Sequence, residues 1–191
     1  MYLSQWRFKR TKTESGDISN PYNAHKVLWK AFPDRKNESR DFLYRMDKKE
    51  NSYFVIMLSD SKPQTTVDLD LIRLAEPQLV FKTKKLYRFL LRANPVKRLS
   101  EQRVRVPLVG EEHLNAWLSR KLSGAATLLE TVPLSRTNLN FCKGSNWGKI
   151  TTVDFQGVIQ CEDPQNLLML VKSGIGPAKA FGCGLMLLKQ E

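Results

Sequence analysis

Two short signals constrain the fold most, because each sets where a helix begins. Asn20-Pro21 and Asp163-Pro164 both place an amide or carboxylate side chain directly before a proline. Such a side chain caps a helix N-terminus, and proline fits the first helical position. The first helix is predicted to run from residue 21 to about 32, before Pro33, and the second to end at Gly174, where glycine favours a helix stop.

The segments around the first helix predict one ferredoxin-like unit. Residues 24, 27, 28 and 31 are apolar at the spacing of a buried helix face. Strands are expected over residues 2–9, 42–46 and 53–58, followed by a short helix over 67–75 and a strand-like segment over 78–94. The resulting order, β-α-β-β-α-β, is that of a ferredoxin-like domain.

The same order is predicted to repeat. Residues 86–93 or 103–109 open the second unit, a helix follows over 111–123, and strands over 128–134 and 149–160 flank a polar hairpin tip. The second capped helix and a last strand over 185–188 complete it. We therefore expect an α+β chain of two tandem ferredoxin-like (RRM-like) domains, residues 1–84 and 85–191, with a C-terminal glycine-rich loop.

That loop concentrates backbone freedom near the C-terminus. Gly174, Gly176, Gly182 and Gly184 fall within eleven residues, between two apolar runs. Glycine lets the main chain turn tightly and approach a ligand closely. An anion cradle, an RNA contact and a packing device all remain open for this loop, and Lys179 is its candidate phosphate contact.

The charge of the chain favours a polyanionic partner. Net charge is +12, and residues 82–105 hold nine Lys and Arg against one Glu. Aromatic and aliphatic residues alternate with these cations, so the segment predicts a structured basic surface. Nucleic-acid binding is favoured over a merely solubilising surface. The candidate contacts are Arg88, Arg92, Lys97, Arg98, Arg103 and Arg105.

Other classes of protein find little support. No apolar run reaches the roughly 20 residues of a membrane span, and the N-terminus lacks a signal-peptide pattern. Cys142, Cys161 and Cys183 lie far apart, which argues against a disulfide framework or a zinc site and fits a cytoplasmic protein. No Walker-type phosphate loop is present.

Carboxylate pairs that could hold a catalytic metal are interpreted as structural. Asp68 and Asp70 are predicted to start the helix over 67–75, and 111–112 and 162–163 also lie at helix starts. Acidic residues are favourable there because they oppose the helix dipole.

The two histidines differ in their surroundings. His113, in the first turn of its helix, is expected either at the surface or partly buried with its hydrogen bonds satisfied. His25 shares a helix stripe with Tyr22, beside Lys26 and Lys30. Metal-free RNA cleavage needs a proton acceptor, a proton donor and cations at the phosphate, and this set offers all three. Whether His25 acts as base or acid stays open at this point.

Several motifs make the chain resemble the CRISPR-associated repeat-processing endoribonucleases of the RAMP superfamily, over nearly its whole length. The pattern Tyr22-x-x-His25-x-x-Leu-Trp-x-x-Phe-Pro33 and the glycine-rich loop carry most of the resemblance. Further matching segments are residues 1–4, 40–43, 91–95 and 105–108.

The resemblance implies two tandem ferredoxin-like domains and metal-independent cleavage of CRISPR precursor RNA at the base of each repeat stem-loop, without a cofactor. It implies a 2′,3′-cyclic phosphate and a 5′-hydroxyl as products. It places catalysis on His25 and Tyr22, phosphate contacts on Lys26 and Lys30, and RNA-stem contacts on Lys143 and Lys149. It also implies that the enzyme stays on its product as a subunit of the Cascade complex, with other Cascade subunits as partners.

Two alternatives remain. A non-catalytic RNA-binding module with tandem RRM-like domains would leave His25 structural, although the aromatic pattern of an RRM is missing. A purely protein-binding scaffold would leave the basic segment unexplained.

Overall fold

The computed structural model describes residues 1–33, 41–99 and 104–191. The chain divides into two compact units. Unit 1 comprises residues 1–78, 140–149 and 179–182, and unit 2 comprises residues 79–139, 150–178 and 183–191. The predicted domain boundary at residue 84 stays a prediction. No helix among the described residues is long and apolar enough to cross a membrane.

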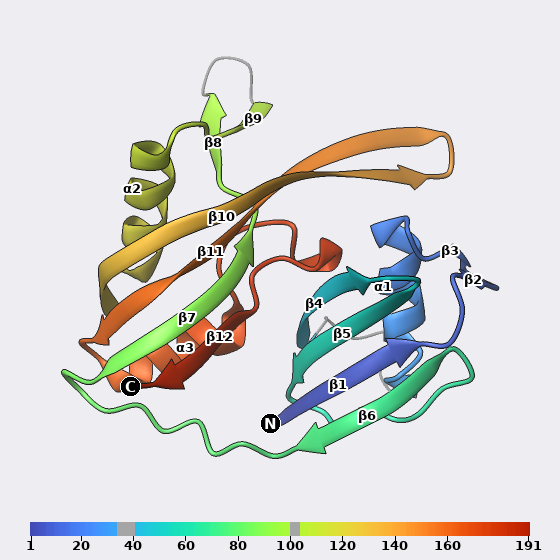
Figure 1. The fold of residues 1–191 in the computed structure, drawn as a ribbon, viewed down its shortest axis with the longest axis horizontal. Coiled ribbons are helices and arrows are strands. Elements are labelled where there is room, and N and C mark those ends of the chain that lie inside the picture. The colour runs from blue at the N-terminus through green and yellow to red at the C-terminus, as the bar shows by residue number, and fades with distance from the viewer. Residues whose placement is uncertain (34–40, 100–103) are drawn as a thin grey trace. The chain divides into compact units, whose positions relative to one another are not determined.

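Unit 1 is built on a four-stranded antiparallel sheet with the order β4-β5-β1-β6 (Figure 1). Its strands are β1 (Tyr2–Phe8), β4 (Phe42–Lys49), β5 (Ser52–Ser59) and β6 (Leu69–Ala75). Helix α1 (Pro21–Trp29) follows a small hairpin of β2 (Lys12–Thr13) and β3 (Gly16–Asp17). In chain order β1 and β5 are the first and third strands of this sheet, and they pair at its centre, which is the ferredoxin-like strand order; the described residues between β5 and β6 form no helix.

Helix α1 begins and packs as predicted but ends earlier. The Asn20 side chain accepts a hydrogen bond from the Tyr22 backbone N–H at 3.1 Å, and Pro21 occupies the first turn. The predicted apolar face is buried in the core with Trp6 and Met57 of the sheet. Residues 30–32 bond to carbonyls three positions back, so the last turn tightens and the helix ends at Trp29.

The helix predicted over residues 67–75 is wrong, because this segment forms strand β6. It pairs antiparallel with β1, with a bulge between Gln5 and Trp6. The outer backbone groups of β1 need hydrogen-bond partners, and β6 supplies them. The apolar residues within 67–75 also fit a helical period over one turn, which is why a helix was predicted. In the strand, Leu69 is buried and Ile72 is exposed.

Asp68 therefore precedes a strand and not a helix, and its carboxylate is fully buried. It accepts hydrogen bonds from Arg10 at 3.0 Å and from Lys30 at 3.1 Å. Burial alone raises the pKa of Asp68, but the hydrogen bonds from Arg10 and Lys30 together outweigh it and leave this pKa below its usual value. The structural interpretation of Asp68 holds, for a different reason than the one expected.

Unit 2 contains a complete β-α-β-β-α-β set, and its sheet order β10-β11-β7-β12 repeats the arrangement of unit 1 (Figure 1). Two tandem ferredoxin-like folds are thus confirmed. The elements are β7 (Leu86–Ala93), α2 (Glu111–Leu122), β10 (Ala126–Lys143), β11 (Asn146–Cys161), α3 (Pro164–Ser173) and β12 (Met186–Gln190). A separate hairpin of β8 (Val96–Leu99) and β9 (Val104–Pro107) lies between β7 and α2 in the chain.

The second helix signal is also confirmed. The Asp163 carboxylate accepts hydrogen bonds from the backbone N–H groups of Gln165 and Asn166, and α3 ends at Gly174. The buried face of α2 packs through Trp117, whose ring stacks on Phe155 of β11 at 6.4 Å.

The polar hairpin tip predicted over residues 135–148 is mostly strand. β10 continues to Lys143 and β11 starts at Asn146, so the turn is confined to Gly144 and Ser145. Polar side chains line this part of β10, and most of them are exposed. The alternation that marks a half-buried strand is therefore missing, although backbone pairing continues.

Asp68→Asn should lower the free energy of unfolding at pH 7 by about 2 kcal/mol, because Arg10 and Lys30 lose their charged acceptor. A pKa that is lowered by folding contributes stability above the ordinary value of 3.8, and this contribution is lost as the pH falls through the folded pKa. The difference in unfolding free energy between wild type and Asp68→Asn should therefore decrease as the pH is lowered.

Urea unfolding between pH 7 and pH 3 measures both quantities. Asp70→Asn is the matched control, because Asp70 pairs with Arg7 at the surface and its loss should cost much less. A difference between wild type and Asp68→Asn that does not depend on pH would contradict this role of Asp68.

Candidate active site

His25 lies on α1 and is partly buried, with three aromatic rings around its imidazole. The ring of Tyr44 stacks on it at 6.3 Å, Phe42 lies at 6.0 Å and Trp29 approaches edge-on at 6.2 Å. Phe42 and Tyr44 come from β4, and their side chains are buried. The imidazole is thus held in one orientation by rigid neighbours while His25 remains partly exposed.

Tyr22 lies one turn before His25, between two lysines. The ammonium of Lys26, also on α1, lies 4.6 Å from the centre of the Tyr22 ring, and that of Lys143 lies 5.8 Å from it. Both contacts are cation–π interactions, and they place positive charge around the phenol. The structure therefore brings together Tyr22, Lys26 and Lys143, which the sequence placed 121 residues apart at most.

The tip of the β10–β11 hairpin is tied to the start of α1. Asn20 uses its side-chain oxygen for the helix cap, and its Nδ2 donates to the carbonyl of Cys142 at 2.9 Å. Phe141 packs on Phe181 with ring centres 4.7 Å apart. A Cβ atom at Gly148 would lie 2.2 Å from the Phe141 ring, so a side chain there would push Phe141 away.

The glycine-rich loop contributes the short 3₁₀ helix η2 (Lys179–Phe181), which packs on α1 and β4. The hydroxyl of Tyr44 donates to the carbonyl of Ala180 at 2.8 Å. Gly182 follows with φ +79°, and a Cβ there would lie 3.3 Å from the Tyr44 ring. Of the roles left open for the loop, packing beside the helix of His25 is the one that this geometry displays.

The other three glycines of the loop belong to unit 2. Gly174 ends α3, the backbone N–H of Gly184 donates to the Arg92 carbonyl at 2.8 Å, and Gly176 passes close to the Trp117 ring. Lys179 lies at the start of η2 and is partly buried.

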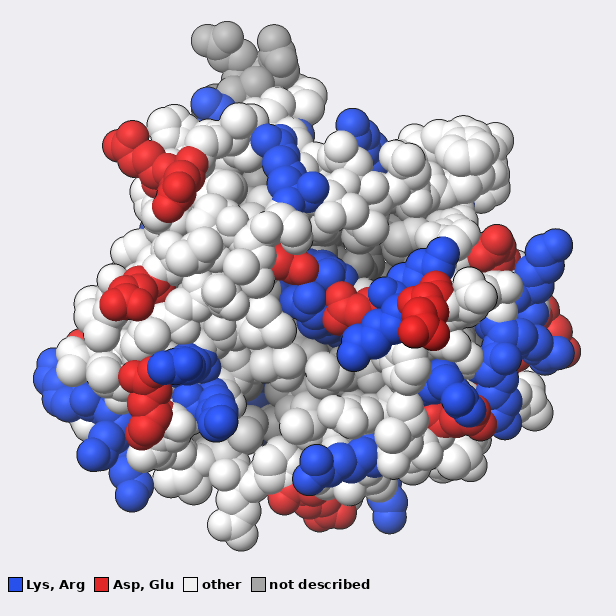
Figure 2. Space-filling view, in the orientation of Figure 1, with Lys and Arg blue, Asp and Glu red and all other residues white. Residues whose placement is uncertain are grey.

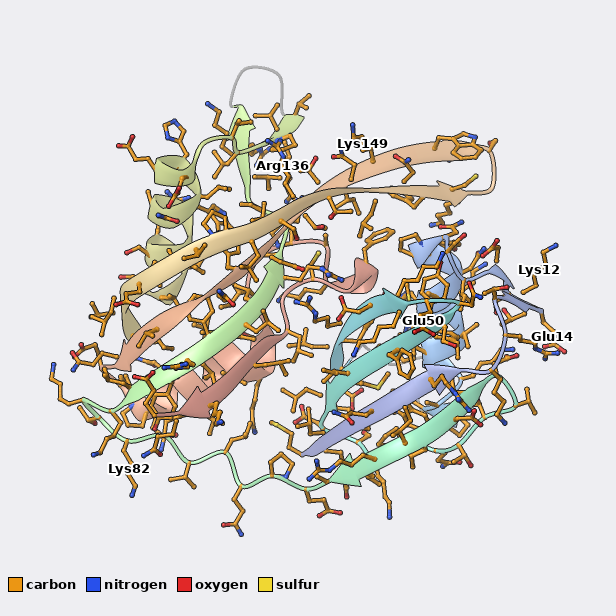
Figure 3. The ribbon with its side chains drawn as sticks, in the orientation of Figure 1. Lys12, Glu14, Glu50, Lys82, Arg136 and Lys149 are labelled. Atoms are coloured by element: carbon orange, nitrogen blue, oxygen red, sulfur yellow. The ribbon has the colours of Figure 1, made fainter. Side chains whose placement is uncertain are left out.

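Lys30 is already engaged within the protein. Its ammonium donates to Asp68 at 3.1 Å and to Glu14 at 3.3 Å, and the hydrogen bond to Asp68 is the main reason that the pKa of Lys30 is raised. Glu14 lies on the turn of the β2–β3 hairpin (Figure 3). Lys26, Trp29 and Lys30 line a cavity of about 520 Å³ together with Phe32 and Pro33.

Two arginines of the predicted basic segment, residues 82–105, form ion pairs within the protein. Arg88 pairs with Glu191 at 2.6 Å, and Arg92, only 19% exposed, pairs with Asp154 at 2.7 Å. Lys97, Arg98 and Arg105 are exposed on the β8–β9 hairpin, whereas Arg103 lies outside the described residues. On the face shown in Figure 2, cations are interleaved with acids and do not form one continuous patch.

Lys149 is exposed on β11 and projects from the hairpin in Figure 3. His113 is exposed on α2, one of the two placements expected for it. Glu162 pairs with Lys84, and Asp163 caps α3, so these acids have structural partners. Within the described parts of the chain, no three His, Cys, Asp or Glu side chains group as metal ligands.

Sequence reasoning missed three residues that build this site. Asn20 was identified as a cap but not as the anchor of the hairpin tip, and Tyr44 and Asp68 were not linked to the site. A buried aspartate and a strand tyrosine carry no sequence signal of their own, because their partners lie far away in the chain.

Comparison with known proteins gives concordant matches. A family model described as "CRISPR associated protein" matches residues 1–190. The CRISPR system Cascade subunit CasE of Escherichia coli K12 is 36% identical over 98% of both chains. The CRISPR-associated endoribonuclease Cse3 of Thermus thermophilus is 32% identical over 89% of this chain and 90% of its own.

The fold agrees with these matches. A solved structure of CRISPR endoribonuclease Cse3 bound to a 19-nucleotide RNA superimposes with a TM-score of 0.87, at 27% identity, over 99% of this chain and 100% of the other. The family resemblance that the motifs predicted is thus confirmed over the whole length. The chain belongs to the family of CRISPR-associated proteins that this model describes.

Proposed function

We propose that this protein is an endoribonuclease that cleaves CRISPR precursor RNA at the base of the repeat stem-loop and stays bound to the product as a Cascade subunit. The observation that carries the proposal is the assembly of His25 and Tyr22 with Lys26 and Lys143 in unit 1. It is supported by two relatives, one named as a Cascade subunit and the other as an endoribonuclease, and by a similar structure bound to RNA.

The residues fit cleavage by the RNA's own 2′-hydroxyl. The 2′-oxygen attacks the adjacent phosphorus and loses its proton, while the bond to the 5′-oxygen breaks and that oxygen gains a proton. Histidine is the side chain best suited to proton transfer near neutral pH, so His25 can carry one of these transfers, and Tyr22 can orient or exchange the other proton. Lys26 and Lys143 stabilise the charge that develops on the phosphate. The products are a 2′,3′-cyclic phosphate and a 5′-hydroxyl, and no metal or cofactor takes part in this scheme.

RNA binding is supported by the β8–β9 hairpin. The register places Arg98 directly opposite Arg105, and both side chains are exposed. Like charges across a strand pair are unfavourable, and a phosphate backbone between them removes that cost. Lys97 lies on the same hairpin, and Lys149 on β11 is a further exposed cation. A-form stems are recognised through such phosphate contacts and through shape. A cytoplasmic location is part of the proposal.

The second candidate is a non-catalytic RNA-binding module. The packing of His25 among Trp29, Phe42 and Tyr44 is what a structural histidine would also display. Only a cleavage assay separates this interpretation from the enzyme.

His25→Ala should slow single-turnover cleavage of repeat RNA in excess EDTA by about 10²- to 10⁴-fold, because a proton-transfer group is lost. Binding of the same RNA should change little. His113→Ala is the matched control and should cleave at the wild-type rate, since His113 is exposed on α2.

RNA with a 2′-deoxy sugar before the scissile phosphate should bind without being cut. Mass spectrometry of the products should find a cyclic phosphate and a 5′-hydroxyl. Cleavage by His25→Ala at the wild-type rate would show that His25 is not catalytic. Binding without cleavage by the wild type would favour the non-catalytic module.

Lys149→Ala should weaken RNA binding about equally for all stem sequences, because it removes a phosphate contact. The slope of log affinity against log salt should become shallower by about 1. Equilibrium binding at several salt concentrations measures this slope. Lys172→Ala, on the exposed side of α3, should leave it unchanged. An unchanged slope for Lys149→Ala would place the hairpin away from the RNA.

A further inference from the structure

The cavity beside α1 has walls of two kinds. It is lined by the apolar residues Trp29, Phe32 and Pro33 and by two lysines, Lys26 and Lys30. Its volume of about 520 Å³ is within the range of small-molecule sites. A ligand that fits both walls has a flat apolar part and an anionic part, which is the chemistry of a nucleotide.

The aromatic wall is rigid. The Trp29 ring meets the Phe42 ring edge-on, with centres 5.3 Å apart, and the Phe32 ring stacks on the same Phe42 ring with centres 5.0 Å apart. Phe32 and Phe42 are buried, whereas Trp29 keeps an exposed portion at the cavity. A fixed, partly exposed indole is a stacking platform for a base, and every base has a face that can use it.

The cationic wall is also held in place. Asp68 is 0% exposed and fixes the ammonium of Lys30, which is itself 35% exposed. An ammonium carries three donors, and Asp68 and Glu14 account for two of them. Lys26 is exposed and carries charge that is not balanced by a carboxylate in any ion pair of the described residues.

The cavity adjoins the candidate catalytic pair. Trp29 touches the His25 ring edge-on, and Lys26 reaches both the cavity and the ring of Tyr22. A nucleotide that stacks on Trp29 therefore lies about one turn of α1 from His25 and about two turns from Tyr22.

We propose that this cavity is a subsite for the first or second unpaired nucleotide beside the scissile phosphate. Its base stacks on Trp29, and its phosphate contacts Lys26 and Lys30. The proposal rests on the proposed function, because a scissile phosphate at the base of a stem lies next to unpaired nucleotides, whose bases are available for stacking.

The test measures binding of an uncleavable stem-loop RNA that carries a 2′-deoxy sugar before the scissile phosphate. Each of the first two unpaired nucleotides is replaced in turn by an abasic one. At one of these positions, removal of the base should weaken binding to the wild type about tenfold. Trp29→Leu should weaken binding of the intact RNA by a similar factor, and Trp29→Phe should retain most of the affinity because it keeps a flat ring.

The two losses should not multiply, since they remove the two halves of one contact. Trp29→Leu should therefore bind the critical abasic RNA about as well as the wild type binds it. Full multiplication of the two factors at both positions would overturn the subsite. A wild-type affinity that is the same for both abasic RNAs and the intact RNA would also overturn the subsite. This result does not depend on whether the Trp29 variants fold.

The outcomes for the two proposals are distinct. If the wild-type protein binds and cleaves the stem-loop but its affinity does not change when the unpaired bases are removed, the proposed function holds and the subsite is wrong. Wild-type protein that does not bind the stem-loop removes the proposed function and the subsite with it.

Discussion

The site depends on one side chain that makes two hydrogen bonds. Asn20 caps α1 with its oxygen and holds the backbone of Cys142 with its nitrogen. The cap positions the turn that carries Tyr22 and His25, and the second hydrogen bond brings Lys143 to the Tyr22 ring. A helix start and a distant hairpin are thereby joined at the place where the proposed chemistry needs both a proton-transfer group and a cation.

The remaining contacts make this arrangement stiff. Tyr44 stacks on His25 and donates to Ala180, so one buried tyrosine links the histidine to the glycine-rich segment. Asp68 is buried beneath Lys30 and limits where its ammonium can go. Such preorganised groups favour catalysis because they do not have to be ordered during the reaction. The glycines serve this packing, while the proposed chemistry belongs to α1 and the hairpin tip.

Features that depend on residues close together in the chain could be predicted from the sequence. The caps at Asn20 and Asp163 and the buried face of α1 depend on neighbouring residues, and the structure confirms them. The predicted element order is confirmed for unit 2, whereas in unit 1 the strand β6 replaces the expected second helix. β6 was mistaken for a helix because its partner β1 lies about 60 residues away, and its period is ambiguous over seven residues. The bond from Asn20 to Cys142 spans 122 residues, and the ion pairs of Arg88 and Arg92 are equally invisible in sequence.

Cleavage by the proposed mechanism requires the hairpin tip to be anchored on α1, and the variant Asn20→Ser removes this anchor. Serine still caps a helix, but its side chain is too short to keep the hydrogen bond to Cys142. The variant should unfold at nearly the wild-type temperature and bind repeat RNA, yet its single-turnover cleavage rate at saturating enzyme should fall about tenfold or more. A stable variant that cleaves at the wild-type rate would show that the residues of α1 act without the anchored tip.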